Sequence, residues 1–303
     1  MMSKSNFPQN SVQTSRLPFV EGRQFWRNLG IMTAFCLPVM YLGIILAVFV
    51  HEVGGHGLAA LLLGGQFNGF GIAPDGLGWA DIDVSGLPPL RQIFMLSAGA
   101  LSTTVLSLVF FVFSLVFKKR RMASFTCLFF AIISILDGLP YFFWDAILLG
   151  GIGDFSIIWL LYPLPAMRVL VIGLGGTLMA LAIIFFNAAF YKIAYEWLGE
   201  GKQIRLKGKI TFSLAIFLLQ AIGWFSFDWN QLIPGIGPLP SIAALAMVLL
   251  TLILLWSFHR PRRVEVVPPE RPHYFAPVGA AWVLCGGVLF VIVQWLQNGI
   301  SFP

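Results

Sequence analysis

The sequence predicts an all-α polytopic membrane protein with about seven transmembrane helices, and two observations support this prediction. Hydrophobic residues make up 58% of the 303 residues and charged residues only 11%, whereas soluble domains carry about 25% charged residues. Long apolar runs also recur along the chain, most of them near the roughly 20 residues that a helix needs to cross a bilayer. The lipid bilayer is therefore the expected environment of most of the chain.

The predicted spans lie near residues 31–63, 92–117, 122–144, 166–191, 210–228, 240–258 and 277–297. A polar tail precedes the first of them. The first run is too long for one straight helix, and we expect Pro38 to kink it or to end a preceding turn, because proline removes a backbone donor.

Two of the connections differ from ordinary loops. Residues 66–84 place aromatic and β-branched residues around Pro74-Asp75-Gly76, a turn signal, so we expect a small β-hairpin after the first span. Residues 145–165 are apolar but broken by glycines and prolines. They predict a re-entrant segment after the third span, which must pack in protein or line a wet cavity.

Lysines and arginines gather in alternate loops, and this pattern predicts the orientation of the chain. They lie in the N-terminal tail, at 118–121, at 202–209 and at 260–271, while the other loops are acidic. Because basic loops face the cytosol, we expect a cytosolic N-terminus, with the end of the first span and the Asp154 loop on the opposite side. The net charge of +6 therefore indicates topology and no nucleic-acid partner.

The segment V-H-E-V-G-G-H places His51, Glu52 and His56 inside an apolar span. Ionisable residues inside the bilayer are energetically costly, and they indicate a functional site by default. The alternative is a polar cluster that only holds helices together. Two histidines and a glutamate this close favour a metal site.

The spacing of these residues differs from the zinc-protease motif H-E-x-x-H by one residue. Residues five apart on an α-helix point about 140° away from each other, so His51 and His56 would not share a face. A π-bulge inserts one residue and would bring them together, and Gly54-Gly55 is a suitable place for it. In a second solution Glu52 and His56, four apart, are both ligands; the bulge leaves Glu52 free as a base.

A catalytic zinc site needs a third protein ligand and an open position for water. The next glutamate, Glu196, lies beside a basic loop, and His259 and His273 lie in another basic loop, on the side opposite the acidic loops. Aspartates remain, either in the hairpin or after the third span: Asp75, Asp81, Asp83, Asp137, Asp145 and Asp154.

The order of motifs from His51 onward resembles the site-2 protease family of intramembrane zinc metalloproteases. That family has H-E-x-G-H followed by small residues and Gly-Gly, and here H-E-V-G-G-H-G-L-A-A-L-L-L-G-G begins at His51. A-G-A-L-S-T at 98–103 lies where the family tends to have A-G-P-x-x-N, and D-G-L-P at 137–140 lies in the place of N-x-x-P. G-I-G-D at 151–154 takes the place of the L-D-G segment. The resemblance covers about residues 40–160.

The chain departs from the family pattern in several places. Its motif has one extra residue, Ala100 replaces the proline, and Thr103 replaces the asparagine. A literal L-D-G occurs at 136–138, but it ends the third span and does not open the next helix. Asp137 therefore stays an alternative to Asp154 as third ligand.

The resemblance implies that His51, His56 and Asp154 bind Zn²⁺, with Asp137 as the alternative to Asp154. It also implies that Glu52 is the catalytic general base, and that metal-activated water cleaves the transmembrane segment of another membrane protein. The hairpin is placed to pair with an unwound substrate as an added strand. Site-2 proteases act from the cytosolic side, whereas the charges place this site on the other side.

The sequence thus predicts a cytosolic tail at 1–29, a metalloprotease-like membrane core at 30–165, and additional transmembrane helices at 166–303. The alternative function is a non-proteolytic membrane protein, a metal-binding transporter or an assembly factor, with a degenerate protease motif. The sequence does not indicate an oligomeric state.

Overall fold

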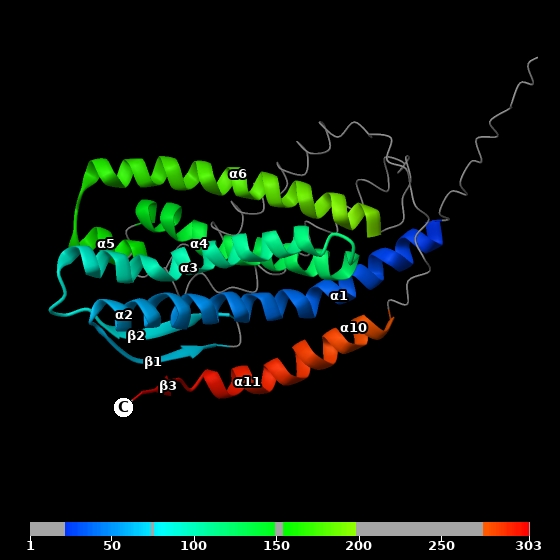
Figure 1. Cartoon of the computed structure of the whole chain (residues 1–303), viewed down its shortest axis with the longest axis horizontal. Coiled ribbons are helices and arrows are strands. Elements are labelled where there is room, and N and C mark those ends of the chain that lie inside the picture. Colours follow the sequence, from blue (N-terminus) through cyan, green and yellow to red (C-terminus); the bar gives the residue numbers. More distant parts are fainter. Residues whose placement is uncertain (1–21, 74–75, 149–153, 198–274, 303) are drawn as a thin grey trace, which may run out of the picture.

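The computed structural model describes residues 22–73, 76–148, 154–197 and 275–302, and its long helices run side by side (Figure 1). The predicted spans near 210–228 and 240–258 lie outside these residues. The elements in chain order, with η for π-helical segments, are α1 (Gly22–Phe49), η1 (Val50–Gly57), α2 (Leu58–Leu63), β1 (Gln66–Ile72), β2 (Gly78–Asp83), α3 (Pro89–Val116), α4 (Arg121–Leu148), α5 (Asp154–Leu161), α6 (Pro165–Trp197), α10 (Phe275–Ala281), η2 (Trp282–Val288), α11 (Leu289–Leu296) and β3 (Ile300–Ser301).

Within the described residues, four helical stretches are long and apolar enough to cross a membrane. They are Gly30–Leu63, Pro89–Val116, Met122–Leu139 and Pro165–Ala182. They coincide with the first four predicted spans, so the expectation of a multi-pass membrane protein is confirmed. The predicted seventh span is helical from α10 through η2 to α11 but is not among the four, so the total of seven spans is confirmed only in part.

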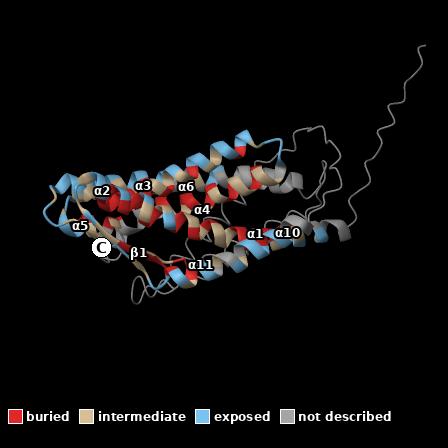
Figure 2. Cartoon of the chain, turned by 60° about the horizontal axis from the view of Figure 1, so that its bottom comes forward, coloured by how far each residue is buried: buried red, intermediate tan, exposed pale blue. Residues whose placement is uncertain are grey.

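The first span packs its inner face against α4. α1 continues past Pro38 and passes directly into η1, so the proline does not end a helix there. Figure 2 shows buried residues gathered between the helices. The largest apolar cluster joins α1 to α4 and includes Met32, Cys36, Val39, Phe125, Leu128 and Ile132.

The outward faces of α3 and α6 carry exposed apolar side chains, as contact with lipid requires. They include Val105, Leu108, Val112, Leu170 and Leu174. Between α3 and α4 the contacts are of another kind, because Ser107 Oγ donates to the Ala131 carbonyl at 2.7 Å. Small and hydroxyl-bearing residues let membrane helices approach and bond to each other.

The predicted hairpin is confirmed. β1 and β2 pair antiparallel from Gln66 opposite Asp83 to Ile72 opposite Gly78, with an irregularity after Phe67. The hairpin follows α2 at the end of the bundle that also holds α5, while the turn between α3 and α4 lies at the other end (Figure 1).

A third strand, which sequence analysis did not predict, comes from the other end of the chain. β3 pairs antiparallel with β1, so that the strand order is β2-β1-β3. The Phe302 N–H also donates to the Asn68 carbonyl at 2.6 Å. Gly69 permits this approach, because a Cβ there would collide with the Ile300 carbonyl oxygen.

The segment predicted to be re-entrant contains the end of α4 and the short helix α5. α5 begins at Asp154 and packs against α3 through a buried cluster that includes Leu96, Phe155 and Trp159. The Tyr162 hydroxyl donates to Gln92 Oε1 at 2.9 Å, which ties the end of α5 to α3. These contacts hold Asp154 close to α3, which also packs against η1.

Candidate metal centre

The H-E-V-G-G-H motif lies on a π-helix, as the spacing predicts. η1 covers Val50–Gly57, and i→i+5 bonding places residues five apart about one turn apart. The rings of His51 and His56 therefore lie together, with centroids 5.1 Å apart. Both side chains are buried, 3% and 4% exposed.

The glycine pair in η1 serves packing more than backbone freedom. Neither Gly54 nor Gly55 has positive φ. A Cβ at Gly55 would lie 2.5 Å from Gly99 Cα on α3, so η1 and α3 approach each other backbone to backbone. Gly54 is exposed, and a Cβ there would meet only Val50, at 3.5 Å.

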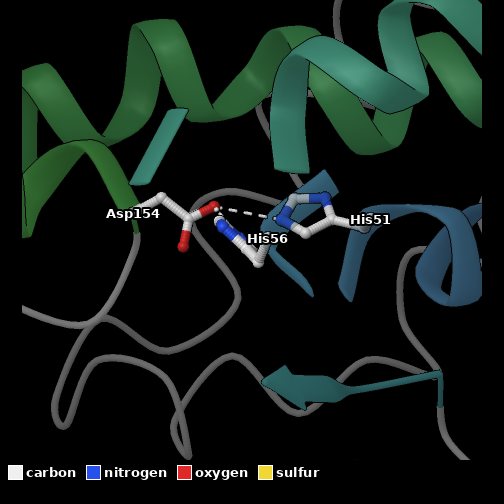
Figure 3. A group of neighbouring side chains, drawn as sticks. All are labelled: His51, His56 and Asp154. Atoms are coloured by element: carbon white, nitrogen blue, oxygen red, sulfur yellow. Dashed lines mark hydrogen bonds and ion pairs between the residues drawn. The ribbon is translucent and has the colours of Figure 1, made fainter. Parts of the chain in front are cut away.

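Asp154 brings a carboxylate from α5 to both histidines (Figure 3). Its Oδ2 lies 3.0 Å from His51 Nε2 and 3.1 Å from His56 Nε2. One ligand atom from each of the three residues lies within 4.8 Å of the others. The second solution, with Glu52 and His56 as a ligand pair, does not describe this cluster, because His51 takes the place of Glu52 in it.

The outer ring nitrogens of the two histidines also have partners. His56 Nδ1 lies 3.0 Å from the Met95 carbonyl oxygen, and His51 Nδ1 lies 3.1 Å from Asp137 Oδ2. A carbonyl oxygen only accepts, so Nδ1 of His56 carries the proton. In a neutral imidazole Nε2 is then a bare lone pair, and it faces the Asp154 carboxylate.

This arrangement of donors fits a bound cation. A lone pair opposite a carboxylate oxygen is repulsive unless a positive charge lies between them. Four ligands at Zn–N and Zn–O distances of about 2.0–2.1 Å stand about 3.3 Å apart in a tetrahedron, close to the 3.0 and 3.1 Å observed. Two histidines and one carboxylate leave a fourth position for water, as catalytic zinc sites do.

Gly99 keeps the centre of the cluster open. A Cβ at this position would stand 2.5 Å from His56 Nε2 and would also collide with His51 Nε2. Sequence analysis quoted this glycine in A-G-A-L-S-T but assigned it no role. Nothing in the sequence indicated this role, because the contact between Gly99 and the histidines depends on how α3 packs against η1.

Glu52 is buried, with 8% exposed, and it lies on the hairpin side of η1. A Cβ at Gly78, the first residue of β2, would stand 2.8 Å from Glu52 Oε1. This carboxylate does not belong to the three-residue cluster, so it is available for a role other than metal binding.

The other candidate residues lie elsewhere. Asp81 is exposed, and the Asp83 carboxylate accepts a bond from the Ser85 N–H at 2.7 Å; the hydrogen bonds of the Ser85 hydroxyl and N–H hold the pKa of Asp83 below its usual range. Nothing is described of the Asp145 side chain in α4, and three candidates fall outside the described residues: Asp75, His259 and His273.

Comparison with known protein families matches residues 27–195, more than half of the chain, to the family described as Peptidase M50B-like. The chain belongs to the Peptidase M50B-like family. The resemblance to site-2 proteases is thereby confirmed, and the match continues beyond residue 160 to residue 195 in α6. Comparison with curated proteins and with solved structures finds no match.

Proposed function

We propose that this protein is an intramembrane zinc metalloprotease that cleaves transmembrane segments of other membrane proteins. The observation that supports it best is the buried His51, His56 and Asp154 cluster on and beside a π-helix, in a chain of the M50B-like family. The π-helix compensates for the extra residue of the motif, so the altered spacing does not argue against a metal site.

In this proposal the cluster residues bind the metal, and Glu52 acts as the general base. His51, His56 and Asp154 hold Zn²⁺, which when bound supplies Lewis acidity and lowers the pKa of water toward about 7. Glu52 accepts a proton from the attacking water on its carboxylate and passes it to the leaving amine. Burial keeps bulk water away from the histidine cluster and from Glu52, which strengthens their electrostatic interactions with the reacting atoms.

The hairpin offers one open edge for an unwound substrate. β3 already pairs with β1, whereas β2 has no partner on its outer edge within the described residues. β2 begins at Gly78, beside Glu52. We therefore propose that the substrate adds as a strand to β2.

Photo-crosslinking tests this pairing, with a reactive group placed at Asp81 on β2 or at Ser301 on β3. Both positions are exposed, which makes them a matched pair. Crosslinks from position 81 and none from position 301 are expected. Crosslinks from 301 alone would show that the substrate approaches the other side of the sheet.

We propose that the active site opens on the side away from the cytosol. The basic turn at 118–121 lies at the end of the bundle opposite the hairpin and α5 (Figure 1), and basic turns face the cytosol. A single cysteine introduced at exposed Ser85 should react with a membrane-impermeant thiol reagent from outside intact cells, whereas one at Lys119 should not. The reverse pattern would contradict this orientation.

The decisive experiment separates metal binding from catalysis. Zinc content and cleavage of a panel of single-span transmembrane peptides are measured for the wild type, Glu52→Gln and His56→Ala. We expect zinc to remain in Glu52→Gln while cleavage is lost, and both to be lost in His56→Ala. Cleavage that survives in Glu52→Gln would overturn the assignment of Glu52 as the base.

The alternative is a non-proteolytic membrane protein, such as a metal-binding transporter or an assembly factor. The buried cluster would serve metal binding in that case too. A wild-type protein that binds zinc but cleaves none of the peptides would favour this alternative. A folded wild type without metal would exclude the protease and leave a polar cluster that packs helices.

A further inference from the structure

A second aspartate contacts the cluster from a different helix. Asp137 of α4 lies 3.1 Å from His51 Nδ1, while Asp154 of α5 lies 3.0 Å from Nε2 of the same ring. His51 is therefore held between two carboxylates. Sequence analysis treated these aspartates as competitors for one role, whereas the structure gives them different positions.

The geometry excludes Asp137 from the ligand cluster. The two nitrogens of an imidazole point away from each other, so a group bonded to Nδ1 lies on the far side of the ring from a metal at Nε2. Asp137 does not belong to the group of ligand atoms that lie within 4.8 Å of one another. Its carboxylate can accept the Nδ1–H of His51 and leave the Nε2 lone pair free to bind metal.

The fold brings Asp137 to this position through close packing of α4 on α3. Gly138, the next residue, is buried, and a Cβ there would stand 2.7 Å from the Ala100 carbonyl oxygen and from Thr103 Oγ1. On its other side, Leu139 belongs to the buried cluster between α1 and α4. Asp137 therefore lies on a turn of α4 that is held on both sides.

The charge of Asp137 also suits a position beside a bound cation. A dication bound by two neutral histidines and one carboxylate keeps a net positive charge, which is costly in an apolar surrounding. The carboxylate of Asp137 adds a second negative charge, which offsets the net positive charge of the cation and its ligands. The corresponding partner of His56 is the uncharged Met95 carbonyl, so of the two histidines only His51 has a carboxylate at Nδ1.

We propose that Asp137 is a positioning residue that fixes the tautomer and orientation of His51 and strengthens it as a zinc ligand. This inference rests on the proposed zinc site but not on proteolysis. Carboxylates bonded to ligand histidines in this way typically contribute about 10–100-fold to metal affinity. The amide of Asp137→Asn can still accept the Nδ1–H but carries no charge. Asp137→Asn is therefore expected to weaken zinc binding less than Asp137→Ala does.

The test measures zinc affinity of the full chain in detergent by competition with a chelating dye. Asp137→Ala should bind zinc about 10–100-fold more weakly than the wild type, with Asp137→Asn in between. Asp83→Asn, which removes an equal charge from the hairpin, should bind as the wild type does. Affinity in Asp137→Ala equal to that of Asp83→Asn would overturn the proposal.

A spectroscopic measurement separates positioning from ligation. With Co²⁺ in place of zinc, Asp137→Asn should keep the visible absorption of a tetrahedral site, whereas Asp154→Ala should change it. The opposite result would make Asp137 the ligand and overturn the proposal. Asp137→Asn keeps the shape of the side chain, so it remains informative if Asp137→Ala does not fold. A folded wild type that binds neither ion would refute the zinc site itself, whereas wild-type metal binding without cleavage would refute only proteolysis.

Discussion

The two π-helical segments of the described chain, η1 and η2, carry adjacent glycines at the same positions. η1 reads V-H-E-V-G-G-H-G and η2 reads W-V-L-C-G-G-V. η1 is pressed against α3, where a Cβ at Gly55 would meet the backbone of Gly99; a Cβ at Gly287 of η2 would meet nothing within 4 Å. Adjacent glycines thus occur in a π-helix in both places, but only η1 carries two histidines, and its packing against α3 buries them.

The surroundings differ in polarity as well. In η1 the residues around the glycines are buried histidines, and three elements converge on them: α3, α4 and α5. In η2 the side chains of Val283 and Leu284 are exposed, and the Trp282 indole N–H donates to the Ala34 carbonyl of α1 at 2.9 Å. The π-helix η1 therefore supplies the histidines and their spacing, and the neighbouring helices supply their carboxylate and carbonyl partners.

The largest effect is expected from Gly99→Ala, which fills the space that distinguishes η1 from η2. The added methyl group would collide with Nε2 of both histidines, so zinc content should fall from about one per chain to a small fraction of that. Gly173→Ala on α6, where a Cβ would meet nothing within 4 Å, is the control and should retain zinc. Equal zinc in both variants would show that the metal does not lie between the two Nε2 atoms.

The next largest effect is expected on stability, when a glycine of each π-helix is replaced by alanine. Gly55→Ala should destabilise the protein by about 1–3 kcal/mol, because it overpacks the contact with α3. Gly287→Ala should be neutral or should stabilise by up to about 1 kcal/mol, because alanine favours helix where there is room. Thermal unfolding in detergent measures both. If the two changes had the same cost, π-helix formation itself, and not packing, would require the glycines.

A smaller effect is expected where α3 bonds to the beginning of η1. The Ser102 hydroxyl lies 3.0 Å from the Val50 carbonyl oxygen and 2.7 Å from that of Gly99, so its proton is shared between η1 and α3. Ser102→Ala should lower the free energy of unfolding by about 1 kcal/mol. Thr177→Ala, which removes a bond within exposed α6, should cost less. A larger loss in Thr177→Ala would indicate that the link between η1 and α3 adds little stability.

The smallest effect is expected from Gly54→Ala. Gly54 is exposed, and the new Cβ would make only an ordinary contact with Val50. Stability should change by no more than about 0.5 kcal/mol, with zinc content unchanged. A loss of zinc in this variant would show that both glycines of η1 have a structural requirement.

The π-helix, the hairpin and the first four spans could be predicted from the sequence because each follows from local chemistry. The spacing of His51 and His56 has few helical solutions, and the turn at 74–76 has a recognisable composition. The strand pairing of β3 could not be predicted, because two residues at the end of the chain carry no strand pattern. The packing role of Gly55 was missed for a similar reason, since its contact partner lies in another helix.

The sequence by itself determined that the chain is a membrane protein with a histidine and glutamate cluster inside its first span, because apolar length and intramembrane charge are properties of one segment. Only the tertiary structure gave Asp154 and Asp137 different positions around the histidines. Asp137 lies near the end of the third span and Asp154 follows that span, and the sequence pattern left both open as the third ligand. Asp154 reaches the Nε2 atoms and Asp137 reaches the far side of the His51 ring, because α4 and α5 approach η1 from different directions.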